Sequence, residues 1–290
     1  MKNLFVLLIV LITFSFGDIM NAQIKYCRYE YNNSSNYGIV KGKTIYNLDK
    51  APWNGGVETG ERVGIDKVKL LHPSEPQIII GLAKSYKESW RDRIPPKTVR
   101  WFIKPPNSAA SPEDNIVLPA SLDAVKVEVE LVIVIGKKVK NVNLKEAGEA
   151  IFGYTLGNDV VGSVDSYHKI QGEPKEMPEK VLAIGLKDGD GFEPFGPVIV
   201  TNFDWKNSNR FMNISNSKTG KNINYNNPTA DLLYTPEKIV SDLSKVFTLF
   251  PGDVISTGTT KSFLCEPGDL VTISINGIGK FSNKIVKTQR

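Results

Sequence analysis

The chain has 290 residues, and its 36 lysines and arginines against 31 aspartates and glutamates leave a net charge of +5. These charges are evenly mixed and no segment forms a basic arm, so we expect no nucleic-acid partner, while small anionic molecules remain suitable ligands. The length allows one large domain, or one domain with an appendage.

The first 22 residues resemble an export signal. Lys2 supplies the charged start, Leu4–Phe16 is an almost unbroken apolar run, and Met20-Asn-Ala22 resembles a cleavage site. The run is too short to span a bilayer comfortably, although an uncleaved anchor is the alternative. We therefore expect a signal peptide over residues 1–22 and an exported protein, periplasmic or extracellular, with no stable membrane insertion after cleavage.

Cys27 and Cys265 are the only cysteines of the chain. An exported protein could join them in a disulfide, but they lie at opposite ends of the sequence, and sequence cannot show that they are close in space. We expect two unpaired, buried thiols instead.

Residues 23–75 have the pattern of a small N-terminal β-domain. Short strand-like runs are separated by polar or glycine turns. The predicted strands cover residues 25–31, 37–41 and 44–48. A short linker between Pro73 and Pro76 follows, so the main domain is predicted over residues 76–290.

The main domain is predicted to contain many strands and few helices. Asn143 and Glu146 resemble a capping box that begins a helix through about residue 152, and Thr235-Pro236 marks a second helix start. Residues 83–100 are polar and suit either a surface helix or a loop. Strands are predicted at 77–81, 101–104, 254–256, 270–275 and 280–286. The fold class is therefore α+β and strand-rich.

Two glutamates on one predicted strand are the strongest functional signal. Glu128 and Glu130 lie two residues apart in the run 126–136, so a strand points both carboxylates to the same face. The continuation 131–135 is apolar on both faces, which predicts burial. Adjacent buried carboxylates repel each other and are costly to desolvate, and a hard divalent cation relieves both costs. The alternative is an edge strand with a solvated acidic face.

Three further features, each weak alone, could complete such a site. Asp159 follows Asn158 where a strand beginning near Gly153 is predicted to end, and it could add a third carboxylate. Lys187 begins a charged turn and could neutralise an anionic intermediate. Thr257-Gly-Thr259 follows a strand and offers two hydroxyls and a backbone N–H. Each of these segments could equally be a structural turn.

Taken in order, these segments resemble the fumarylacetoacetate hydrolase family over about residues 76–286. The segments that carry the resemblance are Lys104-Pro-Pro106, Glu128-x-Glu130, Asn158-Asp159, Lys187 before Pro194-Phe-Gly-Pro197, Pro251-Gly-Asp253 and Thr257-Gly-Thr259. The resemblance implies a mixed β-roll of twisted strands behind a small N-terminal β-domain, and a homodimer. It also implies activity on small 2-oxo acids and β-diketo acids: C–C hydrolysis, decarboxylation or isomerisation through a metal-bound enolate.

The resemblance also implies roles for individual residues. Glu128, Glu130 and Asp159 match the family's metal ligands, usually for Mg²⁺ or Mn²⁺, with Ca²⁺ as a competitor in an exported compartment. Lys187 matches the lysine beside the metal. Contact with a small anionic 2-oxo acid substrate is expected from Thr259, Lys104 and Ser163.

The chain departs from the family at the general base and at an anion contact. Many members carry an Asn-Tyr-x-x-His segment, and we expect Lys87 at the histidine position, with Glu88 beside it. Ser163 replaces the family's substrate-binding arginine, which removes a bidentate carboxylate contact. A lysine is a poor base at neutral pH unless burial lowers its pKa.

Three interpretations of this chain follow. In the first, the protein is an enzyme of altered chemistry in which Lys87, Glu88 or Lys187 moves protons. In the second, His168 from the loop 163–180 replaces the missing base. In the third, the protein binds a metal and a 2-oxo acid but has lost turnover. We expect an enzyme, because an intact charged cluster costs stability unless it is used.

Overall fold

The structure is a computed structural model that describes residues 22–91, 93–163 and 186–288. The expected signal peptide falls almost wholly on residues 1–21, and His168 also lies outside the described residues. Within the described part of the chain, no helix is both long and apolar enough to span a membrane.

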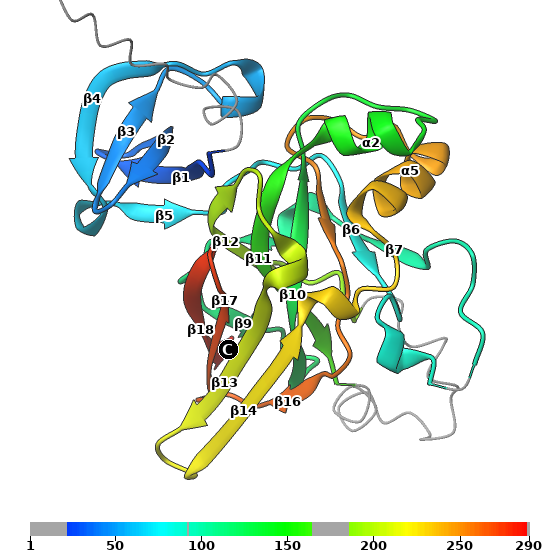
Figure 1. Cartoon of the computed structure of the whole chain (residues 1–290). Helices are drawn as coiled ribbons and strands as arrows, with labels where there is room; N and C mark the ends of the chain where they lie inside the picture. The colour runs from blue at the N-terminus through cyan, green and yellow to red at the C-terminus, as the bar shows by residue number, and fades with distance from the viewer. Residues whose placement is uncertain (1–21, 92, 164–185, 289–290) are drawn as a thin grey trace, which may run out of the picture.

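The N-terminal strands form an antiparallel meander at one side of the molecule, drawn in blue to cyan in Figure 1. Its strands are β1 (Lys25–Tyr31), β2 (Ser34–Lys41), β3 (Thr44–Leu48), β4 (Glu58–Gly64) and β5 (Lys69–Leu71), with short 3₁₀ turns η1 (Pro52–Asn54) and η2 (Ile65–Lys67). The meander is continuous with the main sheet, because Lys25 and Tyr26 of β1 pair with Val200 and Ile199. The strands predicted at 25–31 and 44–48 are confirmed, and the one predicted at 37–41 is present but begins three residues earlier, at Ser34.

Among the described residues, thirteen strands form the first and larger sheet. Besides the meander it contains β6 (Ile79–Leu82), β7 (Trp101–Lys104), β8 (Ala109–Ala110), β10 (Val125–Ile135), β11 (Ile151–Gly162), β12 (Glu193–Val200), β15 (Val254–Ser256) and β16 (Phe263–Cys265). The main path runs β4-β3-β2-β1-β12-β11-β10-β15-β6-β7, and the remaining strands pair at its sides. The long antiparallel pair β10–β11 lies in the middle of this path, where it is covered on both faces.

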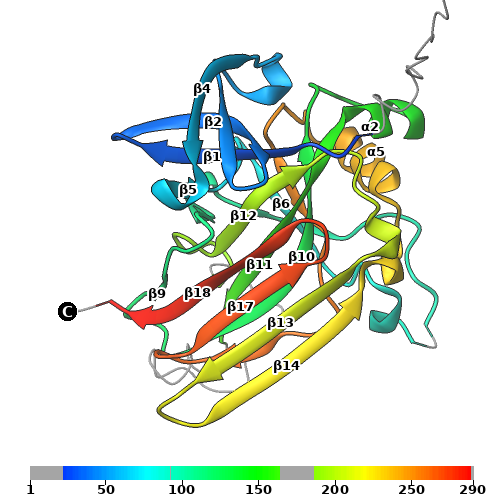
Figure 2. The ribbon, with the colours of Figure 1, turned by 60° about the vertical axis from the view of Figure 1, so that its left-hand side comes forward.

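Five strands form the second sheet, in the order β14-β13-β17-β18-β9, which is visible across the front of Figure 2. They are β9 (Ile116–Leu118), β13 (Asn209–Asn216), β14 (Lys221–Pro228), β17 (Leu270–Ile275) and β18 (Gly279–Lys287). Most pairs are antiparallel, but β15–β6 and β18–β9 are parallel, so the sheets are mixed. The expected strand-rich α+β fold is confirmed.

Two α-helices lie side by side above the first sheet (Figure 1). Helix α2 (Leu144–Ala150) begins with the predicted capping box between Asn143 and Glu146. It ends two residues earlier than predicted, because Ile151 and Phe152, which favour strands, open β11. Helix α5 (Pro236–Val246) begins as predicted, with the Thr235 hydroxyl accepting from the Lys238 N–H.

The described parts of the segment predicted as a surface helix or a loop, residues 83–91 and 93–100, form a loop that contains the 3₁₀ turn η3 (Lys87–Ser89). The other 3₁₀ turns are η4 (Pro106–Ser108), η5 (Trp205–Asn207) and η6 (Thr229–Asp231). Cys27 and Cys265 are both buried, free thiols, as expected. Burial raises the pKa of each thiol to about 12, so neither is a reactive thiolate at neutral pH.

Candidate active site

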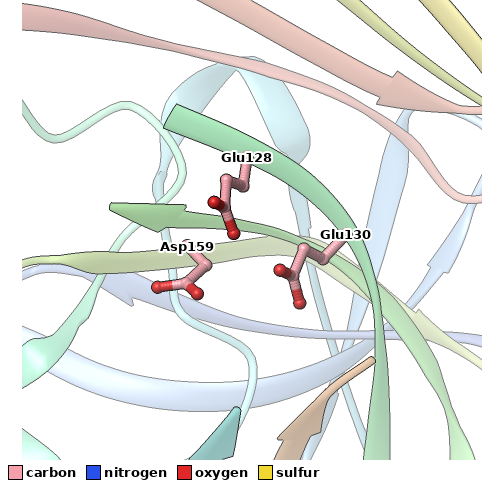
Figure 3. A group of neighbouring side chains, drawn as sticks. All are labelled: Glu128, Glu130 and Asp159. Atoms are coloured by element: carbon pink, nitrogen blue, oxygen red, sulfur yellow. The ribbon is translucent and has the colours of Figure 1, made fainter. Parts of the chain in front are cut away.

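Three carboxylates from two neighbouring strands meet on one face of the first sheet (Figure 3). Glu128 and Glu130 both lie on β10, and Asp159 lies directly opposite Glu128 on β11. One oxygen from each of the three side chains lies within 4.8 Å of the others. The prediction that Asp159 ends a strand was wrong, because β11 continues to Gly162. Asp159 lies beside Glu128 because the antiparallel register of β10 and β11 pairs these two residues.

Glu130 is the most constrained of the three carboxylates. It is buried, and its Oε2 accepts a hydrogen bond of 2.6 Å from the Gly258 N–H. Its Oε1 is also buried and accepts no hydrogen bond from the described residues. Desolvation, reinforced by the charges of Asp159 and Glu128, raises the pKa of Glu130 well above its ordinary value. An unpartnered oxygen beside two more carboxylates fits a hard divalent cation.

The segment after β15 closes one side of this site and depends on its glycine. Gly258 has φ of +84°, and a Cβ there would lie 2.8 Å from the Leu82 carbonyl oxygen and 2.4 Å from the Ser85 hydroxyl oxygen. Only glycine combines this backbone conformation with so close an approach. The turn aims the Gly258 N–H at Glu130 and leaves the Thr259 hydroxyl buried without a partner among the described residues.

Lys187 brings a positive charge to the three carboxylates. Its ammonium donates to Asp159 Oδ2, lies 3.7 Å from Glu128 Oε2, and is 4.5 Å from the centre of the Phe102 ring. Burial alone would lower the pKa of Lys187, but Asp159 and Glu128 outweigh it and raise that pKa. Lys187 is therefore a charged group that can stabilise an anion or donate a proton, and it is a poor base at neutral pH.

A cavity of about 690 Å³ opens over Glu128 and Lys187. Its wall is lined by Leu82, Ala83, Lys84, Ser89, Phe102, Ile103, Glu128, Lys187, Asp188, Thr259, Thr260, Lys261 and Ser262. The wall thus combines apolar side chains with three lysines. The predicted residues Glu128, Lys187 and Thr259 meet at this cavity, and Glu130 and Asp159 lie next to Glu128 at its base.

The family model described as fumarylacetoacetate (FAA) hydrolase, C-terminal, matches residues 79–286. The chain belongs to the fumarylacetoacetate hydrolase family. A second model, described as Rv2993c-like, N-terminal, matches residues 24–73. The family assignment made from the sequence is confirmed.

Relatives and solved structures agree with this assignment. A 4-hydroxyphenylacetate degradation bifunctional isomerase/decarboxylase of Salmonella dublin is 34% identical over 193 residues, which are 66% of this chain and 42% of that protein. The structure of 5-carboxymethyl-2-hydroxymuconate delta-isomerase from Mycobacterium smegmatis is 30% identical, with a TM-score of 0.76 over 91% of this chain and 100% of that chain. Maleylpyruvate hydrolase from Sphingobium sp. SYK-6, in complex with manganese(II) ion and pyruvate, is 23% identical with a TM-score of 0.66 over the same shares, and this likeness shows a common fold.

The structure does not bring Lys87 and Glu88 to the cavity. Both side chains are exposed, and Glu88 lines a neighbouring hollow instead. From this stretch Ser89 reaches the cavity wall. Counting along the family's Asn-Tyr-x-x-His segment from Tyr86 gives the same answer, because the histidine position then falls on Ser89. The expectation that Lys87 occupies that position was therefore wrong by two residues.

The expectation that Lys104 contacts the substrate was also wrong. Its side chain is 0% exposed, and its ammonium is 2.5 Å from Asp159 Oδ1 and 2.7 Å from the Phe192 carbonyl oxygen. Lys104 lies behind the carboxylates, where it orients Asp159. Asp159 is held from both sides by lysines, which outweigh burial and lower its pKa.

Ser163 lies at the far end of β11 and is not part of the described cavity wall. It is buried, and its N–H donates to the Ala124 carbonyl oxygen. The structure adds a residue that the sequence analysis missed: Glu193, which is fully buried and lies 2.9 Å from Lys104. A carboxylate between Phe192 and Phe195 in a strand is the signal that could have marked it.

The raised pKa of Glu130 predicts how stability depends on pH. In the metal-free protein the native state retains the Glu130 proton at pH values where the unfolded chain has lost it. The free energy of unfolding should therefore fall as pH rises from about 5 towards 8. Thermal unfolding in EDTA across this range measures the slope. Excess Mn²⁺ should flatten it, and an unchanged slope in Glu130→Gln would exclude Glu130 as its source.

Proposed function

We propose that this protein is a divalent-metal-dependent enzyme that acts on a small 2-oxo or β-diketo acid through an enolate. The observation that carries the proposal is the buried group Glu128, Glu130 and Asp159, with Lys187 beside it, at the base of a cavity. The cation would be Mg²⁺ or Mn²⁺, with Ca²⁺ as a competitor. Relatives that are isomerases or decarboxylases support this substrate class.

Glu128, Glu130 and Asp159 would hold the cation, which would bind the 2-oxo acid and draw electrons from its keto group. Lys187 adds a fixed positive charge about where the enolate oxygen would form. The buried Thr259 hydroxyl, which has no partner among the described residues, would donate to the substrate carboxylate. Apolar residues such as Leu82 and Phe102 would exclude water from the reacting end.

Among the three reactions, we favour decarboxylation. Hydrolysis needs a base that activates water, and none of the described residues on the cavity wall is a histidine. Decarboxylation of a substrate with a second carboxylate β to the keto group needs no such base. The bond between the α-carbon and that β-carboxylate breaks, its electron pair forms the enolate with the keto group, CO₂ leaves, and the enolate carbon takes a proton from water. Asp188, on the cavity wall, could relay that proton.

The assay that tests the function uses residues 23–290 with Mg²⁺ or Mn²⁺ against 2-oxo and β-diketo acids, including oxaloacetate and acylpyruvates. Turnover that EDTA abolishes would support a metal-dependent enzyme. Stabilisation by Mn²⁺ plus a 2-oxo acid without turnover would favour the second candidate, a binding protein. Ser89 and Ser163, which stand where the family has histidine and arginine, favour that candidate.

Lys84 and Lys261 predict a preference for substrates with a second anionic group. Both line the cavity wall, and no ion pair of either is found among the described residues. The Lys84 carbonyl oxygen accepts from Trp90 Nε1 at 2.7 Å, which fixes this turn at the cavity edge.

Replacing Lys84 and Lys261 together with methionine should raise KM for a 2-oxo dioate about fivefold, because each exposed charge contributes modestly. The kcat value should change little, since neither lysine is needed at the enolate. Lys43→Met, an exposed change on the N-terminal meander, is the control. An unchanged KM in the double variant would refute a role for this pair.

We also propose that residues 1–22 direct export and that the protein is a homodimer. Cell fractionation of the full chain tests export. Light scattering of residues 23–290 tests whether the protein is a homodimer.

A further inference from the structure

Glu193 is a fully buried carboxylate that the proposed reaction does not use. It is the first residue of β12 and lies between the buried side chains of Phe192 and Phe195. A carboxylate in such surroundings is costly unless it is paired and hydrogen-bonded. Its contacts therefore indicate what it does.

One oxygen of Glu193 accepts a hydrogen bond and the other forms an ion pair at the back of the active site. The Ser256 hydroxyl, at the end of β15, donates to Oε1, and Lys104 Nζ lies 2.9 Å from Oε2. On β11, a Cβ at Gly157 would lie 3.2 Å from Oε1, so the glycine leaves room for this carboxylate. Glu193 is thus enclosed by β7, β11 and β15, which carry Lys104, Gly157 and Ser256.

Lys104 connects Glu193 to Asp159. Its ammonium donates hydrogen bonds to Asp159 Oδ1 at 2.5 Å and to the Phe192 carbonyl oxygen at 2.7 Å. It also forms an ion pair at 2.9 Å with Glu193 Oε2, which accepts no hydrogen bond from the described residues. The ammonium is therefore held in one place and is shared between two carboxylates. Asp159 faces Lys104 with Oδ1 and the cavity-side Lys187 with Oδ2.

The net charge of this cluster suits a divalent cation. The carboxylates are Glu128, Glu130, Asp159 and Glu193, and the ammoniums are Lys104 and Lys187. When all are ionised, two negative charges are in excess, which matches one divalent cation. Without Glu193, the Lys104 ammonium would pair with Asp159 alone, and the cluster would have one excess negative charge in place of two.

We propose that Glu193 is a positioning residue: by sharing the Lys104 ammonium, it keeps Asp159 oriented and sufficiently negative to ligate a divalent cation. The inference rests on the proposed function, because it assumes that Asp159 is a ligand. Glu193 touches neither cation nor substrate. It acts through Lys104, as outer partners of metal ligands commonly do.

Calorimetric titration of Mn²⁺ into residues 23–290 tests this role without using activity. Glu193→Gln keeps the shape and the Ser256 contact but removes the charge, and it should weaken Mn²⁺ binding about tenfold. Asp253→Asn is the matched control: Asp253 is equally buried, and it binds the Gln77, Ile78 and Phe250 N–H groups away from the site. It should lower the unfolding temperature without changing the affinity for Mn²⁺.

A double-mutant cycle with Lys104→Met shows whether Glu193 acts through Lys104. Glu193→Gln should cost about tenfold in the natural background and little in the Lys104→Met background. An equal cost in both backgrounds would overturn the role. Glu193→Asp retains the charge but withdraws the carboxylate from Lys104, so it too should weaken Mn²⁺ binding. Natural affinity in this variant would overturn the positioning role, because the position of the carboxylate would then not matter.

The outcomes separate the two claims. If the unaltered protein binds no Mn²⁺, the proposed function fails and the inference fails with it. If the unaltered protein binds Mn²⁺ and the Glu193 variants bind it equally well, only the positioning role is overturned.

Discussion

Replacing Lys187 with methionine is expected to lower kcat by about a hundredfold to a thousandfold, the usual cost of removing one group that stabilises an oxyanion. The same change should leave the affinity for Mn²⁺ unchanged or increase it. The reason is that the Lys187 ammonium lies against Asp159 and near Glu128, where it opposes a cation. Steady-state kinetics and calorimetry on the same preparation measure the two effects.

This split between turnover and metal affinity distinguishes a chemical role from a structural one. A lysine that only holds Asp159 in place would be needed for Mn²⁺ binding, so its loss would weaken affinity and turnover together. Lys187→Arg is the informative companion, because it keeps the charge with a larger head group. Weaker Mn²⁺ binding in Lys187→Met would contradict our assignment of Lys187.

Replacing Glu130 with glutamine should weaken Mn²⁺ binding by at least about a hundredfold and abolish turnover, since it removes a charged ligand from the centre of the group. The fold should survive, because the glutamine oxygen can still accept from the Gly258 N–H. In EDTA the variant should unfold at a higher temperature than the natural protein near pH 8, because the costly ionisation of the buried Glu130 carboxyl is removed.

Glu149→Gln, an exposed change at the end of α2, is the matched control for charge removal. It should alter neither Mn²⁺ binding nor stability appreciably. A Glu130→Gln protein that binds Mn²⁺ like the natural one would remove Glu130 from the site, and with it the proposed reaction.

The metal-site residues were predictable because strand geometry is local. Alternation alone points Glu128 and Glu130 to one face, and the apolar run after them predicts burial. Asp159 was found through the family pattern, although its predicted position at a strand end was wrong. What joins it to Glu128 is the β10–β11 register, a contact between residues far apart in sequence that no local pattern determines.

The residues behind and beside the site were not predictable in the same way. Lys104 was expected to contact the substrate. That expectation failed because a lysine before Pro105-Pro106 gives no sign in the sequence of where its long side chain points. It is buried beside Glu193, which the sequence analysis did not mark at all. In the loop, Lys87 was expected at the histidine position of the family segment, whereas the turn at Lys87–Ser89 exposes Lys87 and brings Ser89 to the cavity.

The central claim is that a buried carboxylate group binds a divalent cation to which a 2-oxo acid then binds. Calorimetric titration tests it most directly: Mn²⁺ is titrated into residues 23–290, and pyruvate is then titrated with and without Mn²⁺. We predict one Mn²⁺ per chain, and pyruvate binding only when Mn²⁺ is present. Pyruvate binding that is equal in EDTA, or no Mn²⁺ binding at all, would contradict the account.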